Sequence, residues 1–241
     1  TPSGRPTLGN LLGALRPLVA GQDAHDCFVG VSDLHALTDG HDPRLLRERT
    51  RDLAALLLAA GLGRSTLFVQ SHVTAHAEAC WILNCVTPVG WLERMTQYKD
   101  KAAQQQSVTA GLLDYPVLMA ADIIMYDAHE VPVGDDQKQH VELARDIAQR
   151  FNHLYGETFV VPEPVIPDVG ARVMGLNDPS VKMSKMYSQV RGHAVGLLDE
   201  PEEIKRAIGR AVTDSGMEIR FSDDPGKAGV NNLLGIYKVI T

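Results

Sequence analysis

The chain has 241 residues, of which 44% are hydrophobic, enough for one large domain or for one domain and part of a second. Its net charge of −7 gives no support for a general nucleic-acid coat protein, although a local basic patch could still bind a specific nucleic acid. The three cysteines, Cys27, Cys80 and Cys85, are too few for a disulfide framework, so we expect a protein of the reducing cytoplasm.

The sequence contains no run of about 18 apolar residues, so no membrane span is expected. It also lacks the basic region and the apolar region that make up a secretory signal. The chain starts within a turn, at residues 1–4, and stops within a helical pattern, at residues 231–241. We therefore expect further segments beyond both ends.

Short apolar runs alternate with longer amphipathic segments along the chain. In chain order, the pattern predicts a strand at 27–32, a helix at 42–61 that ends at Gly61, a strand at 66–71, helices at 75–86, 90–103 and 115–126, a strand at 130–134 with Pro132 at its edge or end, a long helix at 135–156, an extended segment at 158–167, and a helix at 199–212 with Asp199 as its N-cap. Cys80 and Cys85, inside one of these helices, are typical of small core residues rather than of a metal or redox site.

This alternation of strands and helices predicts an α/β fold with a doubly wound parallel sheet of Rossmann-like arrangement. Such sheets bind ligands beyond the carboxyl ends of their strands. After about Met186 only helix and loop are predicted. We therefore expect one domain over residues 1–186 and the start of an α-helical domain over residues 187–241.

The stretch PSGRPTLGN, Pro2–Asn10, places a turn rich in glycine and proline directly before a helix. Free N–H groups and the helix dipole favour an anion at such a helix start, and Thr7 and Asn10 add side-chain donors there. The turn is neither a Walker A loop nor a GxGxxG loop. Spacing alone therefore favours an ordinary capped helix over a phosphate site.

Two further segments follow predicted strands, where a doubly wound sheet places its ligands. In VPVGDDQKQH, Val131–His140, Gly134 permits close backbone approach and two carboxylates start a helix. This pattern indicates either simple helix capping or a bound ribose or amino group. His35, in VSDLHALTDG, follows the strand at 27–32, and a lone histidine at such a place is more often structural than functional.

The segment YPVLMAAD sets Tyr115, Met119 and Asp122 on one face of a helix. Asp122 lies among apolar residues, and a buried carboxylate needs a partner. That partner is either a structural hydrogen bond or the N–H group of a ligand.

The segment VKMSKM, Val181–Met186, carries two lysines among apolar residues. Lys182 and Lys185 could neutralise a polyphosphate as flexible point charges, or they could belong to a solvated loop.

Together these five segments resemble the class I aminoacyl-tRNA synthetases, and among them the tryptophan-specific branch. TLGN at Thr7–Asn10 is similar to the HIGH-type motif of that family, and KMSKM at Lys182–Met186 is similar to its KMSKS loop. VPVGDDQKQHVELARDIAQRFN resembles a strand–helix segment of the family along nearly its whole length, and GARVMGLNDPSVKMSK and AVTDSG follow in the expected order. The resemblance covers essentially the whole chain. The tyrosine-specific branch would place Gln where this chain has Met119.

The resemblance implies a role for each matching residue. For ATP it implies contacts from Thr7, Gly9, Asn10, Gly134, Asp136, Lys182, Met183, Ser184 and Lys185. For tryptophan it implies contacts from His35, Tyr115, Met119, Asp122, Val131, Val133 and Gln137. Asp122 would accept the indole N–H, whereas Tyr115 and Gln137 would hold the amino end of the substrate. Catalytic roles on the phosphates are implied for Thr7, Asn10, Lys101, Lys182 and Lys185.

The implied chemistry joins L-tryptophan to ATP, with Mg²⁺, to give tryptophanyl-adenylate and pyrophosphate, and then passes the aminoacyl group to tRNA(Trp). A carboxylate is already a nucleophile at pH 7, so catalysis would rest on positioning and on stabilising the developing negative charge. The resemblance also implies a homodimer. Residues 187–241 would begin a C-terminal helical domain that recognises the anticodon, and the rest of that domain and the first strand of the family are absent from the sequence.

One residue departs from the family pattern. Met186 stands where the motif has Ser, which removes a hydroxyl donor worth about 0.5–1.5 kcal/mol, so weakened activation is expected rather than its loss. Two alternative functions remain open. One is a synthetase-like paralogue that binds tryptophan or ATP as a sensor or as an antibiotic-resistance auxiliary copy, without charging tRNA. The other is a different HIGH-containing nucleotidyltransferase, which would leave YPVLMAAD unexplained.

Overall fold

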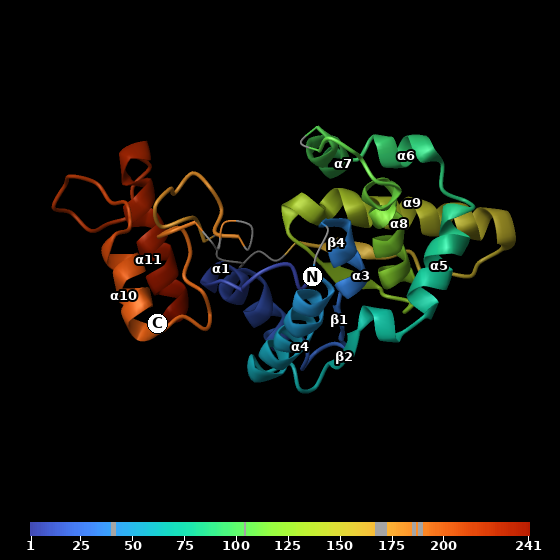
Figure 1. Cartoon of the computed structure of the whole chain (residues 1–241), viewed down its shortest axis with the longest axis horizontal. Helices are drawn as coiled ribbons and strands as arrows, with labels where there is room; N and C mark the ends of the chain where they lie inside the picture. Colours follow the sequence, from blue (N-terminus) through green and yellow to red (C-terminus); the bar gives the residue numbers. More distant parts are fainter. Residues whose placement is uncertain (40–41, 104, 167–172, 185–186, 188–189) are drawn as a thin grey trace. The chain divides into compact units, whose positions relative to one another are not determined.

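The computed structural model describes residues 1–39, 42–103, 105–166, 173–184, 187 and 190–241, and the remaining residues are the grey trace in Figure 1. The chain divides into two compact units, each assembled from separate stretches. The first unit comprises Thr1, Gly30–Pro43 and Phe68–Asp168, and the second comprises Pro2–Val29, Arg44–Leu67 and Val169–Thr241. None of the described helices is long and apolar enough to cross a membrane.

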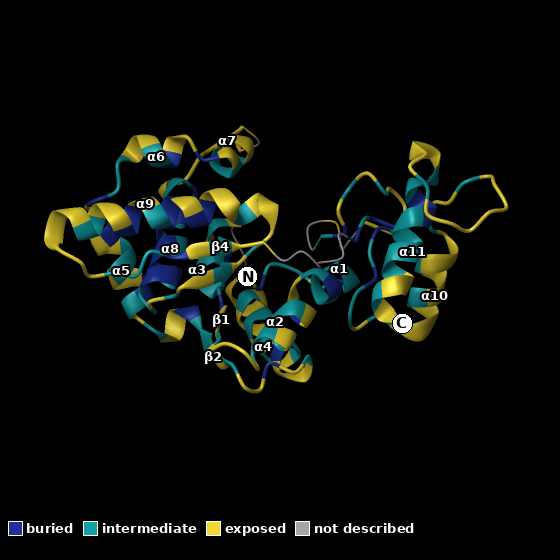
Figure 2. Ribbon diagram, turned by 180° about the vertical axis from the view of Figure 1, so that it is seen from behind, coloured by how far each residue is buried: buried dark blue, intermediate teal, exposed yellow. Residues whose placement is uncertain are grey.

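Three helices build the core of the first unit: α5 (Ala75–Asn84), α8 (Ala110–Ile124) and α9 (Lys138–Tyr155). Small and branched apolar residues on α8 and α9 let the two helices pack closely, and they form much of the dark interior in Figure 2: Val117, Ala120, Ala121, Ile124, Val141, Ala144 and Ile147. Shorter helices complete the unit: α3 (Asp33–Ala36), α6 (Val89–Glu93) and α7 (Thr96–Ala102).

The described strands are short and form two-stranded sheets. β1 (Phe28–Val31) pairs with β2 (Thr66–Val69), and β3 (Glu130–Pro132) pairs in parallel with β4 (Glu163–Val165). β1 and β2 are mainly apolar and are followed directly by the polar residues Ser32 and Gln70, whereas Gly134 lies two positions beyond the end of β3. Helices and parallel pairing together confirm the predicted α/β class.

The second unit is mainly helical. Its N-terminal part runs helically from Leu8 to Gly21, as α1 (Leu8–Asn10), a wider π-type turn (Leu11–Leu15) and α2 (Arg16–Gly21). The long helix α4 (Pro43–Ala59) stops just before Gly61, whose φ of +110° is a conformation that glycine adopts without strain.

The C-terminal helices of the second unit, α10 (Pro201–Gly209) and α11 (Ala228–Ile240), lie side by side in Figure 1. Their apolar faces pack against one buried cluster, which consists of Leu12, Val173, Leu176, Met183 and Val195. The N-terminal helical run and the segment around Met183 therefore share a core with the C-terminal helices.

Two local predictions are wrong, each for a physical reason. Residues 90–103 form two helices rather than one, because Met95 adopts extended backbone (φ −60°, ψ 126°) and has a buried side chain, 2% exposed. Asp199 does not cap the helix that follows it: the N-cap is Glu200, and the Asp199 carboxylate instead accepts the N–H of Gly196 at 2.7 Å. The domain boundary at residue 186 stays a prediction.

The packing of α11 depends on a glycine. Gly229 is buried, and a Cβ at this position would collide with the backbone carbonyl of Val212. We expect Gly229→Ala to lower the free energy of unfolding by about 1–3 kcal/mol, the usual cost of overpacking, in a urea titration.

Gly235, on the same helix, is the matched control because a Cβ there meets nothing within 4 Å. Gly235→Ala should raise stability by up to about 1 kcal/mol, since alanine is the better helix former. Equal effects of the two substitutions would contradict the packing argument.

Candidate functional site

Thr7 and Asn10 bond to each other at the start of α1. The backbone N–H of Thr7 donates to Asn10 Oδ1 at 2.9 Å, the Thr7 hydroxyl donates to the same oxygen at 3.1 Å, and the N–H of Asn10 donates to the Thr7 carbonyl at 2.9 Å. Thr7 is completely buried. The two residues thus cap the helix as the spacing favours, and a phosphate contact by either of them stays a prediction.

Gly9 lies at this helix start, close to the KMSK segment (residues 182–185) of the second unit. A Cβ on Gly9 would lie 2.6 Å from the carbonyl oxygen of Met183, so only glycine allows this approach. The Met183 side chain, 1% exposed, packs into the apolar cluster of the second unit, and its N–H donates to the Val173 carbonyl at 3.0 Å. Only the backbone of Met183 therefore remains for its predicted contact with ATP.

The structure describes only some of the other residues in this segment. Lys182 is exposed and Ser184 is half-buried. Met174 and Lys182 form an antiparallel bridge, which holds the base of the segment. Lys185 and Met186 lie outside the described residues, so the predictions for them are unchanged.

Asp122 accepts hydrogen bonds from three side chains in the first unit. Gln70 Nε2 lies 2.8 Å from Oδ1 and 2.9 Å from Oδ2, His76 Nδ1 lies 2.6 Å from Oδ1, and His35 Nε2 lies 2.8 Å from Oδ2. The Asp122 side chain is 20% exposed, whereas Gln70 and His76 are buried. The donors offset the cost of removing a carboxylate from water and fix its orientation.

Two of these donors, Gln70 and His76, are held in turn by further hydrogen bonds. Gln70 follows the end of β2, and its Oε1 accepts the N–H of Leu34 at 3.1 Å. His76 lies on α5, and its Nε2 accepts from the Tyr126 hydroxyl at 2.9 Å. His76 therefore carries its hydrogen on Nδ1, because a carboxylate only accepts.

Sequence reasoning predicted His35 and Asp122 but missed Gln70, His76 and Tyr126. A signal for Gln70 was present, since it is a polar residue directly after an apolar strand, where such folds place ligands. His76 and Tyr126 gave no pattern of their own, because their role depends on the packing of α5 beside α8.

Tyr115 lies at the centre of a second polar group in the first unit. Its hydroxyl is 2.9 Å from His140 Nε2 and 3.4 Å from Gln97 Oε1, and Gln97 Nε2 donates to the Asp136 carbonyl at 2.9 Å. Burial and then the Asp39 carboxylate raise the pKa of Tyr115 to about 12, so the phenol stays protonated. Burial lowers the pKa of His140 to about 4, so its imidazole is neutral at pH 7.

Lys101 is near the same tyrosine. Its Nζ lies 3.5 Å from Asp39 Oδ1 and 5.7 Å from the centre of the Tyr115 ring. An anion close to Tyr115 would therefore meet this ammonium group, whose charge is partly balanced by Asp39.

The predicted residues that follow β3 form a compact turn. Asp136 Oδ2 accepts from Gln137 Nε2 at 3.0 Å, and a Cβ on Gly134 would lie 2.9 Å from Asp136 Oδ1, so the Asp136 carboxylate lies close to the glycine backbone. The predicted apolar residues Met119, Val131 and Val133 are half-buried and pack against the core of the first unit.

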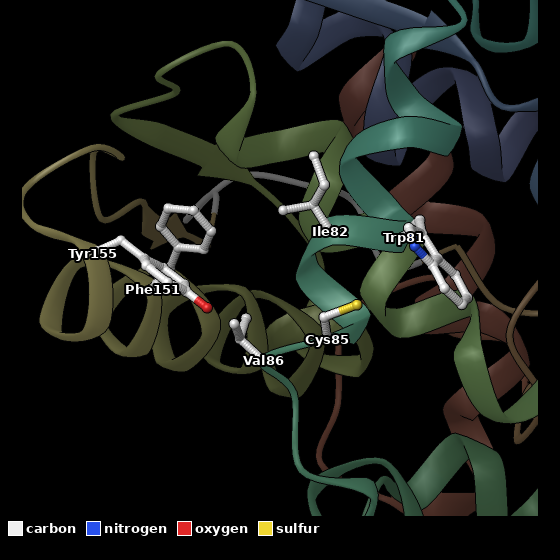
Figure 3. Close-up of a pocket in the computed structure, with 6 residues that line it drawn as sticks. All are labelled: Trp81, Ile82, Cys85, Val86, Phe151 and Tyr155. Carbon is white, nitrogen blue, oxygen red and sulfur yellow. The ribbon is translucent and has the colours of Figure 1, made fainter.

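An apolar hollow of about 280 Å³ lies elsewhere on the first unit, between α5 and α9 (Figure 3). Its lining consists of Trp81, Ile82, Cys85, Val86, Phe151 and Tyr155. These side chains offer no positive charge for a phosphate and no carboxylate for an ammonium group. The hollow also includes none of the predicted site residues.

Comparison with known proteins places this geometry in a family. The model of the class I tRNA synthetases for tryptophan and tyrosine (W and Y) matches residues 1–241. The chain belongs to this family. A tryptophan–tRNA ligase of Caldanaerobacter subterraneus is 55% identical to the synthetase over 242 residues, covering 100% of this chain and 73% of the relative.

Solved structures agree with the fold of the synthetase. The tryptophanyl-tRNA synthetase of Mycoplasma pneumoniae is 40% identical, with a TM-score of 0.89 over 99% of this chain and 70% of that one. The Campylobacter jejuni enzyme, solved with ADP and tryptophan, is 37% identical, with a TM-score of 0.85 over 100% of this chain and 73% of that one. The predicted Rossmann-like α/β fold of the synthetase is thus confirmed.

Burial of His140 makes the stability of the synthetase depend on pH. Its pKa is about 4 in the folded chain and 6.5 ordinarily, so between these pH values the unfolded chain binds a proton that the folded chain does not. We expect the free energy of unfolding to fall as the pH drops through this window, by at most about 1.4 kcal/mol per pH unit from this group. Urea titrations at several pH values measure the slope.

His140→Gln is the control, since an amide does not titrate. The slope of the variant should be shallower than that of the wild type between pH 4 and pH 6.5. Identical slopes would show that His140 is not buried in its neutral form.

Proposed function

We propose that this synthetase is a tryptophan–tRNA ligase, which activates L-tryptophan with MgATP to tryptophanyl-adenylate and transfers the aminoacyl group to tRNA(Trp). The observation that carries the proposal is the 55% identity to a tryptophan–tRNA ligase over 100% of the chain. The Campylobacter enzyme, solved with ADP and tryptophan, supports the same pair of ligands.

Activation is an in-line attack of the tryptophan carboxylate on the α-phosphorus of ATP, with pyrophosphate as the leaving group. Because the carboxylate is already ionised at neutral pH, no general base is needed, and the protein positions the reactants and stabilises negative charge. This need explains a site of lysines and helix-start donors in place of a nucleophile–base pair.

In the second unit, Thr7, Gly9 and Asn10 contact the phosphates, and Lys182, Met183, Ser184 and Lys185 close over them. The approach of the Gly9 backbone to Met183 supports a shared role for the two motifs. For a phosphate to bind, the Thr7 hydroxyl and the Asn10 amide exchange part of their mutual hydrogen bonding for bonds to the ligand.

In the first unit, Gly134 and Asp136 bind the ribose, and Lys101 stabilises phosphate charge. The turn after β3, with its glycine beside a carboxylate, supports the ribose contact. Mg²⁺ enters with ATP and is held mainly by the phosphates.

Asp122 accepts the indole N–H of tryptophan, and His35, Met119, Val131 and Val133 line the indole pocket. Both oxygens of Asp122 already accept hydrogen bonds from these donors, so the indole N–H takes the place of one donor. His35 is the donor that yields, because its side chain is 12% exposed whereas Gln70 and His76 are 1% and 0% exposed. Tyr115 and Gln137 hold the amino end.

The decisive experiment is tryptophan-dependent exchange of pyrophosphate into ATP. The chain should catalyse exchange with tryptophan and much more slowly with tyrosine or phenylalanine. No exchange together with intact tryptophan binding would favour a tryptophan sensor over an enzyme.

Asp122→Ala should lower the apparent affinity for tryptophan or the rate of tryptophan-dependent exchange by more than about tenfold. This is the scale of a lost buried hydrogen bond to a charged group. Asp122→Asn keeps the shape of the side chain but removes its charge and replaces one of its two acceptor oxygens with an N–H donor. It should show the same direction of change, which separates the loss of the charged acceptor from unfolding. Exchange kinetics at varied tryptophan concentration measure both.

Asp114→Asn, on the same helix, is the matched control because Asp114 accepts from Asn84 Nδ2 at 3.0 Å and belongs to no proposed contact. It should leave the KM for tryptophan unchanged. Unaltered discrimination against tyrosine and phenylalanine in both Asp122 variants would refute the role of Asp122 as the indole reader.

The synthetase acts in the cytoplasm, where tRNA is charged, and forms a homodimer. Large exposed apolar side chains on α5 and α9 support a subunit contact: Trp81, Ile82 and Tyr155 are 71%, 52% and 66% exposed. Such a surface is apolar enough to be covered by a second copy.

Sedimentation should give twice the mass of the 26.2 kDa chain, and Trp81→Glu should shift the distribution to the monomer, because it places a charge in the apolar contact. Tyr237→Glu, at a residue that is 67% exposed in the second unit, is the control and should leave the dimer intact. A wild-type chain that sediments as a monomer would contradict the dimer.

A further inference from the structure

A chain of hydrogen bonds in the first unit begins at His140 and ends at the backbone of Asp136. His140 Nε2 lies 2.9 Å from Tyr115 Oη, Tyr115 Oη lies 3.4 Å from Gln97 Oε1, and Gln97 Nε2 lies 2.9 Å from the Asp136 carbonyl oxygen. The imidazole of His140 is 1% exposed, and its Nδ1 has no hydrogen-bond partner in the part of the chain that the structure describes.

The hydrogen bond from Gln97 to the Asp136 carbonyl determines which group donates in each of the other two hydrogen bonds. A backbone carbonyl only accepts, so the amide nitrogen of Gln97 faces Asp136 and its Oε1 faces Tyr115. Because Oε1 also only accepts, the Tyr115 hydroxyl donates to it. The oxygen of Tyr115 is then left to accept, and His140 donates to it from Nε2–H.

The orphaned nitrogen of His140 agrees with this direction. The neutral imidazole carries one hydrogen, and placing it on Nε2 leaves Nδ1 as a bare acceptor. The opposite tautomer would leave a buried N–H without an acceptor, which folded proteins tolerate far less well.

We propose that His140 is a positioning residue for the amino group of the substrate: by donating to Tyr115, it turns the tyrosine hydroxyl toward Gln97 and leaves one oxygen lone pair for a ligand N–H. This inference rests on the proposed function, in which Tyr115 holds the amino end of tryptophan. Gln97 is the second member of the arrangement, since its Oε1 accepts the hydrogen bond that the Tyr115 hydroxyl donates.

A Tyr115 oxygen held in this way prefers a ligand group that donates a hydrogen bond over one that accepts. The α-ammonium group of tryptophan has only hydrogens to offer, and the held Tyr115 oxygen receives one of them. In indole-3-lactate a hydroxyl replaces the amine, while the indole read by Asp122 is the same. If His140 is lost, the tyrosine hydroxyl is free to rotate, and the ammonium loses its prepared acceptor while the lactate hydroxyl, which both donates and accepts, is little affected.

The experiment compares tryptophan with indole-3-lactate on the wild-type chain, His140→Leu and His140→Gln. His140→Leu should raise the KM for tryptophan in pyrophosphate exchange about 5–10-fold, the size of one hydrogen bond, and leave the Ki of indole-3-lactate within about twofold. In His140→Gln the amide N–H stands in for Nε2–H and should restore the wild-type ratio. Circular dichroism checks that both variants fold.

A double-mutant cycle adds a second readout. In a Tyr115→Phe background, His140→Leu should cause no further rise in the KM for tryptophan, because it acts only through the tyrosine hydroxyl. Additive effects, equal weakening of both ligands, or a His140→Gln variant no better than His140→Leu would overturn the proposal.

Calorimetric titration of the same two ligands keeps this test separate from the proposed function. A wild-type chain without exchange activity contradicts the ligase proposal, while the ratio of the two dissociation constants still reports on His140. An unchanged ratio in His140→Leu overturns the inference even where exchange is intact.

Discussion

The bond set around the Asp122 carboxylate is the interaction on which the polar interior of the first unit depends. A carboxylate among the buried apolar residues of helix α8 would be costly to bury, and Gln70, His76 and His35 offset that cost with short hydrogen bonds. These donors arise at the end of β2, on α5 and on α3, so the strand ends and the helix packing must be correct for the carboxylate to be satisfied. The same requirement leaves Asp122 with a single orientation.

The second unit relies on backbone proximity more than on side-chain bonding. Gly9 allows the start of α1 to touch the carbonyl of Met183, and Leu8 N–H donates to the Val195 carbonyl at 2.8 Å. The apolar anchors Leu12 and Met183 sit in one cluster, which fixes the base of the KMSK segment while Lys182 stays exposed. An exposed lysine beside such a buried cluster suits a polyphosphate, because lysine acts as a point charge that needs no fixed geometry.

How much of this was predictable from the sequence depends on how local each signal is. The strands, α4, α5 and α9 follow from apolar periodicity, and Gly61 marks the helix end through its backbone conformation. The break at Met95 was missed because tertiary burial, rather than a helix breaker, causes it. Asp122 and Tyr115 were found as unusual residues on a helix face, but Gln70, His76 and His140 act through partners 25 to 52 positions away. No local pattern encodes such distant partners, although the place of Gln70 directly after an apolar strand marks it as a candidate.

The two polar groups of the first unit follow one physical scheme. At Asp122, acceptor oxygens are held by buried donors, and in the function we propose the more exposed donor His35 gives way to a ligand N–H. At Tyr115, an acceptor oxygen is held by the buried donor His140, and in the same proposal its remaining lone pair faces a ligand N–H. In both cases the protein presents an acceptor that cannot turn into a donor, and a ligand without the matching hydrogen leaves that acceptor unpaired. Tryptophan carries such a hydrogen at both places, on its indole and on its ammonium group, so the proposed site would select it by fixed polarity at two points more than by pocket shape alone.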